Sequence, residues 1–331
     1  MTTAMHRTPS TTCLRAHSFR GLVTGPRLIV LGAVHGNETC GTRAIERVLG
    51  EFDSGALLLQ RGSVTFVPIT NPLAYQRRQR MGERNLNRNL YPNAVPQDYE
   101  DRIANVLCPL LAEHDVLLDL HSFHTAGEAF VMVGPRNNSG TLEPFTHAAQ
   151  EQALALRLGP RRIVEGWLET YATGVQRRLA RTAPEDRARL LSTDPRYGVG
   201  TTEYMRTQGG YGITLECGQH DDPNAPEVGY QAIRRTLAHL GLVEEAPPSA
   251  TPDIQALRLT EVVDKYDAGD QFSRAWASYD PVRKGELIGT RHDGTTVLAP
   301  HDGYIVFPNP AAVAGNEWFY FAQASTRNLG T

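Results

Sequence analysis

The sequence predicts an α/β protein in which a mixed, mostly parallel β-sheet is flanked by helices and followed by a small C-terminal β domain. Two features carry this prediction. Apolar runs rich in β-branched residues alternate with longer segments in which apolar residues recur at helical spacing, a pattern typical of α/β folds. After the proline-rich segment VEEAPPSATPD, only short strand patterns with tight turns follow.

The expected strands are continuous apolar runs, which suit a sheet covered on both faces. They occupy residues 28–34, 63–69, 115–121, 128–134 and 212–218. Helical spacing of apolar residues predicts the helices between and after them, at residues 40–52, 98–114, 149–159 and 227–241. This alternation favours a mostly parallel sheet.

The same patterns divide the chain into three segments. Residues 1–20 are expected to be a polar leader, residues 21–245 the α/β domain, and residues 250–331 the C-terminal β domain. The tripeptide HDG occurs twice in the last segment, at 292–294 and 301–303, as a turn signal between strands.

Composition narrows the classes of function. The net charge of -3 gives no reason to expect a nucleic acid or an anionic membrane as partner. There is no apolar run of about 18 residues and no secretory signal, so we expect a cytoplasmic protein without a membrane span. The four separated cysteines are expected to be reduced thiols: Cys13, Cys40, Cys108 and Cys217.

A histidine and a glutamate follow the first apolar run in the stretch RLIVLGAVHGNETCG. His35 and Glu38 are three residues apart, so a helical turn or tight loop brings both side chains to one face. In open α/β sheets, ligand sites lie just past the carboxyl ends of strands. Catalytic zinc usually takes three protein ligands from His, Glu and Asp, so the pair predicts part of a metal site.

The third metal ligand is expected in the stretch DVLLDLHSFH. His121 ends a buried strand, and we prefer it over the competing His124, which lies further into a loop. Asp119 shares a strand face with His121 and could orient it or the metal shell.

Two further features predict catalysis on a small anion. Glu216 lies within a buried apolar strand, where its carboxylate would have a raised pKa and suit proton transfer from activated water. Residues 70–93 carry arginines and asparagines, and guanidinium groups bind carboxylates bidentately. Few aromatic residues interrupt this stretch, which favours a pocket for a small anionic substrate over a nucleic-acid surface.

The motifs HGNE, RMGERNLNR, DLH and GITLECG, in this order, resemble the succinylglutamate desuccinylase/aspartoacylase family, which belongs with the zinc carboxypeptidase-like hydrolases. The resemblance covers residues from about 25 to 220, and the C-terminal β segment looks like the appended domain of that family. It implies a zinc-dependent amidohydrolase, with one Zn²⁺ per chain, that cleaves an N-acyl group from a small N-acyl amino acid. The C-terminal domain is then expected to cap the active site.

The resemblance also implies roles for individual residues. His35, Glu38 and His121 match the zinc ligands, and Glu216 matches the general base. Arg80 matches the arginine that polarises the scissile carbonyl. Substrate binding is implied for four further residues: Asn87, Arg88, Arg206 and Tyr320.

One position departs from the family pattern, and two rival functions stay open. The family usually has aspartate where this chain has Asn85, which leaves the identity of the acyl group open. The rivals are a zinc carboxypeptidase acting on peptides or cell-wall peptides and a non-catalytic binding module on the same fold. The sequence leaves the assembly, monomer or homo-oligomer, equally open.

Overall fold

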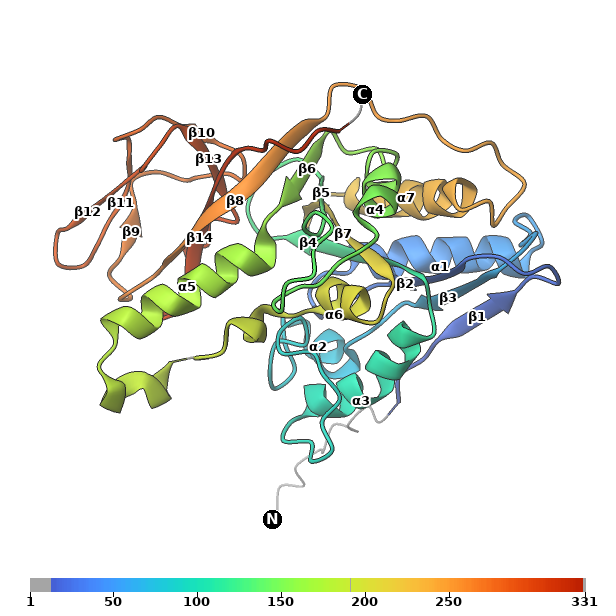
Figure 1. The fold of residues 1–331 in the computed structure, drawn as a ribbon, viewed down its shortest axis with the longest axis horizontal. Helices are drawn as coiled ribbons and strands as arrows, with labels where there is room; N and C mark the ends of the chain where they lie inside the picture. The colour runs from blue at the N-terminus through green and yellow to red at the C-terminus, as the bar shows by residue number, and fades with distance from the viewer. Residues whose placement is uncertain (1–12, 191, 330–331) are drawn as a thin grey trace, which may run out of the picture.

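The computed structural model describes residues 13–190 and 192–329. An eleven-stranded mixed sheet runs through the molecule, with helices on both faces (Figure 1). Its strand order is β1-β3-β2-β4-β7-β5-β6-β8-β14-β13-β10. The predicted α/β class is therefore confirmed.

The five strands predicted for the α/β domain are all present. They are β2 (Arg27–Leu31), β3 (Ser63–Val67), β4 (Val116–Phe123), β5 (Phe130–Met132) and β7 (Tyr211–Gln219). Strands β3, β2, β4 and β7 pair in parallel, and β5 pairs antiparallel with β7. The four predicted helices are α1 (Cys40–Asp53), α3 (Tyr99–Ala112), α4 (Ala148–Ala155) and α7 (Ala225–His239).

The structure adds elements that the sequence patterns did not predict. They are β1 (His17–Arg20), β6 (Arg162–Glu165), α2 (Pro72–Arg77), α5 (Trp167–Arg181), α6 (Thr201–Thr207) and two 3₁₀ turns, Pro184–Arg189 and Pro195–Gly198. Part of the expected leader thus belongs to the sheet, since β1 pairs antiparallel with β3. Residues 1–12 of that leader lie outside the described residues.

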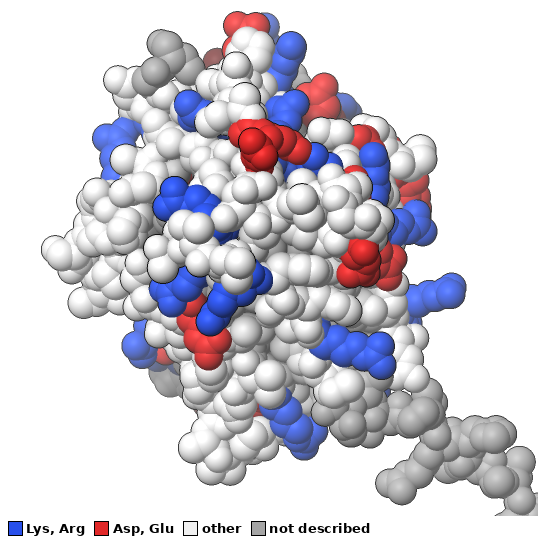
Figure 2. All heavy atoms as spheres, turned by 90° about the vertical axis from the view of Figure 1, so that its right-hand side faces the viewer, with Lys and Arg blue, Asp and Glu red and all other residues white. Residues whose placement is uncertain are grey.

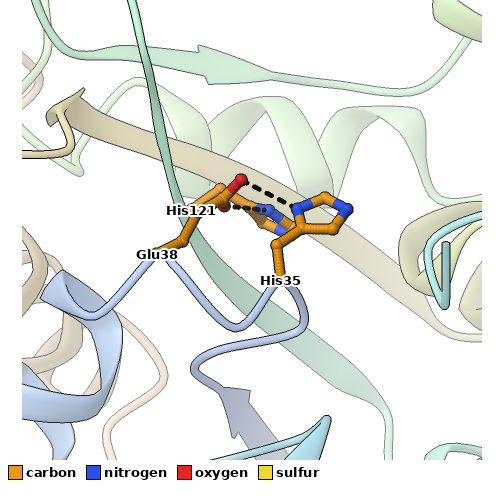
Figure 3. A group of neighbouring side chains, drawn as sticks. All are labelled: His35, Glu38 and His121. Atoms are coloured by element: carbon orange, nitrogen blue, oxygen red, sulfur yellow. Dashed lines mark hydrogen bonds and ion pairs between the residues drawn. The ribbon is translucent and has the colours of Figure 1, made fainter. Parts of the chain in front are cut away.

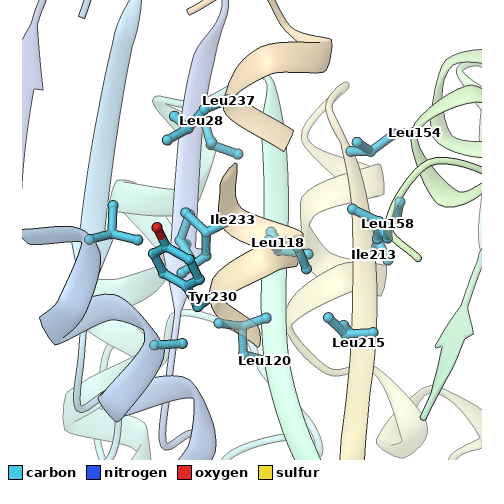
Figure 4. Packing of buried hydrophobic residues seen from close by; sticks show 14 of the residues in the cluster. Leu28, Leu118, Leu120, Leu154, Leu158, Ile213, Leu215, Tyr230, Ile233 and Leu237 are labelled. Atoms are coloured by element: carbon cyan, nitrogen blue, oxygen red, sulfur yellow. The ribbon is translucent and has the colours of Figure 1, made fainter. Parts of the chain in front are cut away.

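Apolar side chains fill both faces of the sheet. On one face, Ile233 and Leu237 of α7 pack over Leu28, Leu118 and other strand residues, together with α1 and α4 (Figure 4). On the other face, α3 and α6 cover the side chains that alternate with these along the same strands. Burial on both faces explains why the strand sequences read as continuous apolar runs.

The C-terminal segment continues the main sheet. Strand β8 (Gln255–Asp264) lies parallel to β6, and three antiparallel strands extend the sheet beyond it: β14 (Glu317–Ala324), β13 (Gly303–Val306) and β10 (Pro281–Val282). A separate small sheet has the order β12 (Thr296–Leu298), β11 (Leu287–Thr290), β9 (Gln271–Phe272). This arrangement carries side chains of β14 toward the α/β domain.

On the face that Figure 2 shows, basic and acidic side chains are interspersed among uncharged ones. None of the helices in the described part of the chain combines the length and apolar character that a membrane span needs.

Candidate metal centre and active site

The loop after β2 carries the first two residues of the site. Gly36 lets this loop lie directly on α2, because a Cβ at this position would come within 1.9 Å of the carbonyl carbon of Ala74. The amide N–H of Glu38 donates to the carbonyl oxygen of His35 over 3.1 Å. This tight turn directs both side chains toward the end of β4.

The Glu38 carboxylate contacts two imidazole rings, those of His35 and His121 (Figure 3). Its Oε1 atom is 2.9 Å from Nδ1 of His35, and its Oε2 atom is 2.9 Å from Nδ1 of His121. One ligand atom from each residue lies within 4.8 Å of the others, and all three residues are buried. The structure therefore brings together the three predicted ligands, and His124 lies outside this group.

The outer nitrogen of each imidazole faces an acceptor. Nε2 of His35 donates to Oδ1 of Asn85 over 2.9 Å, and Nε2 of His121 lies 2.9 Å from Oδ2 of Asp119. These acceptors would hold a proton on each Nε2 atom and so leave the Nδ1 lone pairs for a metal ion. Two imidazole nitrogens and one carboxylate form a donor set that fits a catalytic divalent cation such as zinc.

Burial and charge keep two of the ligands in the forms that bind metal. Burial, together with the positive charge of Arg80, lowers the pKa of His35 to about 4. Burial alone would raise the pKa of Glu38, but His35 and His121 outweigh it and hold this pKa well below its usual value. Burial would lower the pKa of His121, but Asp119 and Glu38 raise it, so metal binding would release a proton there.

Glu216 lies beside the metal ligands on the neighbouring strand. It pairs with His121 in the parallel β4–β7 ladder, so the two side chains share one face of the sheet. Its Oε2 atom is buried and has no hydrogen-bond partner among the described residues. Burial raises the pKa of Glu216 to about 8, which suits a group that accepts and returns a proton near neutral pH.

Arg80 reaches the same centre from the loop after α2. Its Nη1 atom lies 2.8 Å from Oε1 of Glu38, and its side chain is half exposed. The buried carboxylate of Glu100 holds the following residues by accepting hydrogen bonds from the backbone N–H groups of Gly82, Glu83 and Arg84. The loop thus returns toward His35, where it supplies Asn85.

Asn87 and Arg88 extend the site toward α5. The amide N–H of Thr201 donates to Oδ1 of Asn87 over 3.0 Å. The guanidinium carbon of Arg88 lies 4.6 Å from the ring centroid of Trp167. Arg88 is therefore held against an aromatic wall.

Tyr320 of β14, in the C-terminal segment, packs against Trp167 and extends this aromatic wall. Its ring centroid is 5.3 Å from that of Trp167, and the residue is only 3% exposed. Its hydroxyl is buried without a hydrogen-bond partner among the described residues. Burial raises the pKa of this hydroxyl well above its usual value, so it remains a neutral donor.

Arg206 does not join the site. Its guanidinium group donates to Glu151, to Glu143 and to the carbonyl oxygen of Gly212, at 2.9, 2.7 and 2.7 Å. Gly212 precedes Glu216 by four residues, which places it about 13 Å from that residue along β7. The structure therefore places Arg206 in a buried ion-pair network away from the metal ligands, which favours a structural role over the expected substrate role.

His220 reaches the site although the sequence patterns did not identify it as a site residue. Its Nδ1 atom lies 2.8 Å from Oγ of Ser122, and its Nε2 atom lies 3.3 Å from Nδ2 of Asn37. His220 thereby links the end of β7 to the two segments that carry the predicted metal ligands. Its position four residues after Glu216 is the only sequence signal that could have found it.

The α/β fold and the buried His-Glu-His cluster near the carboxyl ends of β2 and β4 fit a metal-dependent hydrolase. The sequence profile of the succinylglutamate desuccinylase/aspartoacylase catalytic domain matches residues 24–238. The chain belongs to this family, whose members are metal-dependent deacylases. No curated protein matches the chain by sequence.

Solved structures share the fold over nearly the whole chain. A succinylglutamate desuccinylase/aspartoacylase from Rhodobacter sphaeroides has a TM-score of 0.69 and 17% identity, covering 94% of this chain and 90% of its own. The product-bound ectoine utilization protein EutE (DoeB) from Ruegeria pomeroyi has a TM-score of 0.67 and 17% identity, with coverages of 93% and 88%. An aspartoacylase family protein from Mesorhizobium loti has a TM-score of 0.63 and 21% identity, with coverages of 95% and 90%.

Proposed function

We propose that this chain is a zinc-dependent amidohydrolase that removes the N-acyl group from a small, anionic N-acyl amino acid. The observation that carries the proposal is the position of Glu216, which lies beside the buried His35–Glu38–His121 centre and whose Oε2 atom has no hydrogen-bond partner among the described residues. A metal site alone is compatible with binding. A buried carboxylate with a raised pKa next to that site adds a group for proton transfer.

Each residue then has a defined task. A bound zinc ion supplies Lewis-acid activation of water and of the scissile carbonyl. Glu216 accepts the proton of the attacking water and delivers it to the leaving amine. Arg80, at the exposed lip of the centre, donates to the carbonyl oxygen as negative charge develops on it.

The substrate carboxylate is bound on the side of α5. Arg88 supplies the positive charge, while Tyr320 and Asn87 supply neutral donors. The buried Tyr320 hydroxyl without a partner supports this assignment, because a substrate oxygen would satisfy it. The aromatic wall of Trp167 and Tyr320 favours a small substrate over a peptide.

A panel of N-acyl amino acids with different acyl groups, together with N-acylated dipeptides, tests the proposal on zinc-loaded protein. We expect cleavage of at least one N-acyl amino acid and none of the dipeptides. Glu216→Gln should keep its zinc and lose about 10²–10⁴-fold in turnover, while the exposed control Glu227→Gln should keep full turnover. Full turnover in Glu216→Gln, or cleavage of dipeptides alone, would overturn the proposal.

A further inference from the structure

The two histidine ligands are joined by a continuous path of polar contacts that passes outside the centre itself. Oδ1 of Asn85, which accepts from His35, also accepts from the backbone N–H of Asn87 over 2.9 Å. Oδ1 of Asn87 accepts from the backbone N–H of Thr201 over 3.0 Å. The hydroxyl of Thr201 donates to Oδ2 of Asp119, the carboxylate oxygen beside His121.

Thr201 connects two segments of the chain that carry site residues. The first segment is the loop that contains Asn85, Asn87 and Arg88. The second segment is β4, which contains Asp119 and His121. Thr201 uses its backbone N–H for the first segment and its side-chain hydroxyl for the second.

The residues around Thr201 allow it to make both contacts. Thr201 is the first residue of α6 and is completely buried. The preceding Gly200 allows the Asn87 amide to approach, because a Cβ at Gly200 would lie 2.0 Å from Oδ1 of Asn87. The Gly200 N–H donates to Glu203 over 2.9 Å, so Glu203 caps the helix and leaves the Thr201 hydroxyl for Asp119.

We propose that Thr201 is a positioning residue that couples the substrate-binding loop to the metal centre. Its hydroxyl fixes the Asp119 carboxylate against His121. Its N–H fixes the orientation of the Asn87 amide, so that Nδ2 remains free to donate. Asn87 therefore selects a hydrogen-bond acceptor, such as a carboxylate or carbonyl oxygen, in a substrate. This inference rests on the proposed zinc centre and deepens the proposed function.

Two variants isolate the hydroxyl of Thr201. Thr201→Val is nearly isosteric and removes only the hydroxyl group, while its backbone N–H still faces Asn87. Thr201→Ser keeps the hydroxyl and removes a methyl group. The measurements are the zinc dissociation constant, obtained by competition with a chelator, and the thermal stability of the metal-free protein.

We expect Thr201→Val to weaken zinc binding by about 10–100-fold, with Thr201→Ser within a few-fold of the wild type. In an Asp119→Asn background the same substitution should have little further effect, because Thr201 acts through Asp119. Unchanged zinc affinity in Thr201→Val, with only a loss of metal-free stability, would reduce Thr201 to an anchor of α6 and overturn the inference.

Two controls keep the outcomes distinct. If Thr201→Val does not fold, Thr201→Ala gives the same comparison, since it also removes the hydroxyl. His35→Ala should abolish zinc binding altogether. If the protein binds zinc but cleaves no N-acyl amino acid, the proposed function is contradicted, while the positioning role of Thr201 is not. If Thr201→Val and the wild type bind zinc equally well and both cleave substrate, the positioning role of Thr201 is contradicted and the proposed function is not.

Discussion

Replacing Arg206 with methionine is expected to destabilise the fold and leave substrate binding intact. The Arg206 guanidinium is buried and forms ion pairs with three acidic side chains: Glu143, Glu151 and Glu203. Removing one partner from a buried charge network costs about 3–5 kcal/mol, because the remaining charges stay buried without compensation. At about 2.1 cal/mol/K per residue, the 331-residue chain has an unfolding entropy of roughly 0.7 kcal/mol/K, so Tm should fall by roughly 4–7 °C.

Thermal unfolding of metal-free protein measures this loss, and Arg47→Met is the matched control. Arg47 pairs with Glu227 on the surface, so its replacement should leave Tm nearly unchanged. Arg206→Lys keeps the charge but loses the planar fork, and should lie between the wild type and Arg206→Met. A stable Arg206→Met protein with a raised KM would refute the structural role and restore Arg206 to the substrate site.

Two further substitutions test the charges and donors described above. Burial raises the pKa of Glu143 from 4.5 to about 7, so the folded state binds this proton more tightly than the unfolded state, and the stability that the bound proton contributes is lost as the pH rises from about 4.5 to about 7. The free energy of unfolding should fall less steeply over this range in Glu143→Gln, and a parallel pH profile measured by urea unfolding would contradict this. Tyr320→Phe removes a buried hydroxyl that has no hydrogen-bond partner among the described residues, so it should raise KM in the hydrolysis assay while leaving Tm unchanged or higher. A clear loss of Tm would show that the hydroxyl has a structural partner.

The sequence predicts the elements whose local pattern and tertiary burial agree. Strands β2, β4 and β7 are covered on both faces, so their continuous apolar runs were sufficient to locate them. Helix α5 was missed because it carries several arginines and buries only part of its surface. The junction of β8 with β6 was missed as well, since pairing between distant segments leaves no local signal.

For the site as well, local patterns identified some residues, and others depend on contacts between distant segments. His35, Glu38 and His121 follow or end buried strands, so strand ends alone were enough to bring them together. The substrate role of Arg206 was implied by the family resemblance, but a matching motif does not reveal which way a helical side chain points. The contacts of His220 and Thr201 depend on loops that meet only in the folded chain.

Zinc content is the measurement that tests the central claim most directly. Elemental analysis after dialysis against zinc should give about one zinc per chain in the wild type and none in His35→Ala, with both proteins folded. This result would establish that the buried His35–Glu38–His121 cluster holds the metal. Equal zinc content in both proteins, or no zinc in the wild type after reconstitution, would contradict the account and leave these residues a purely structural role.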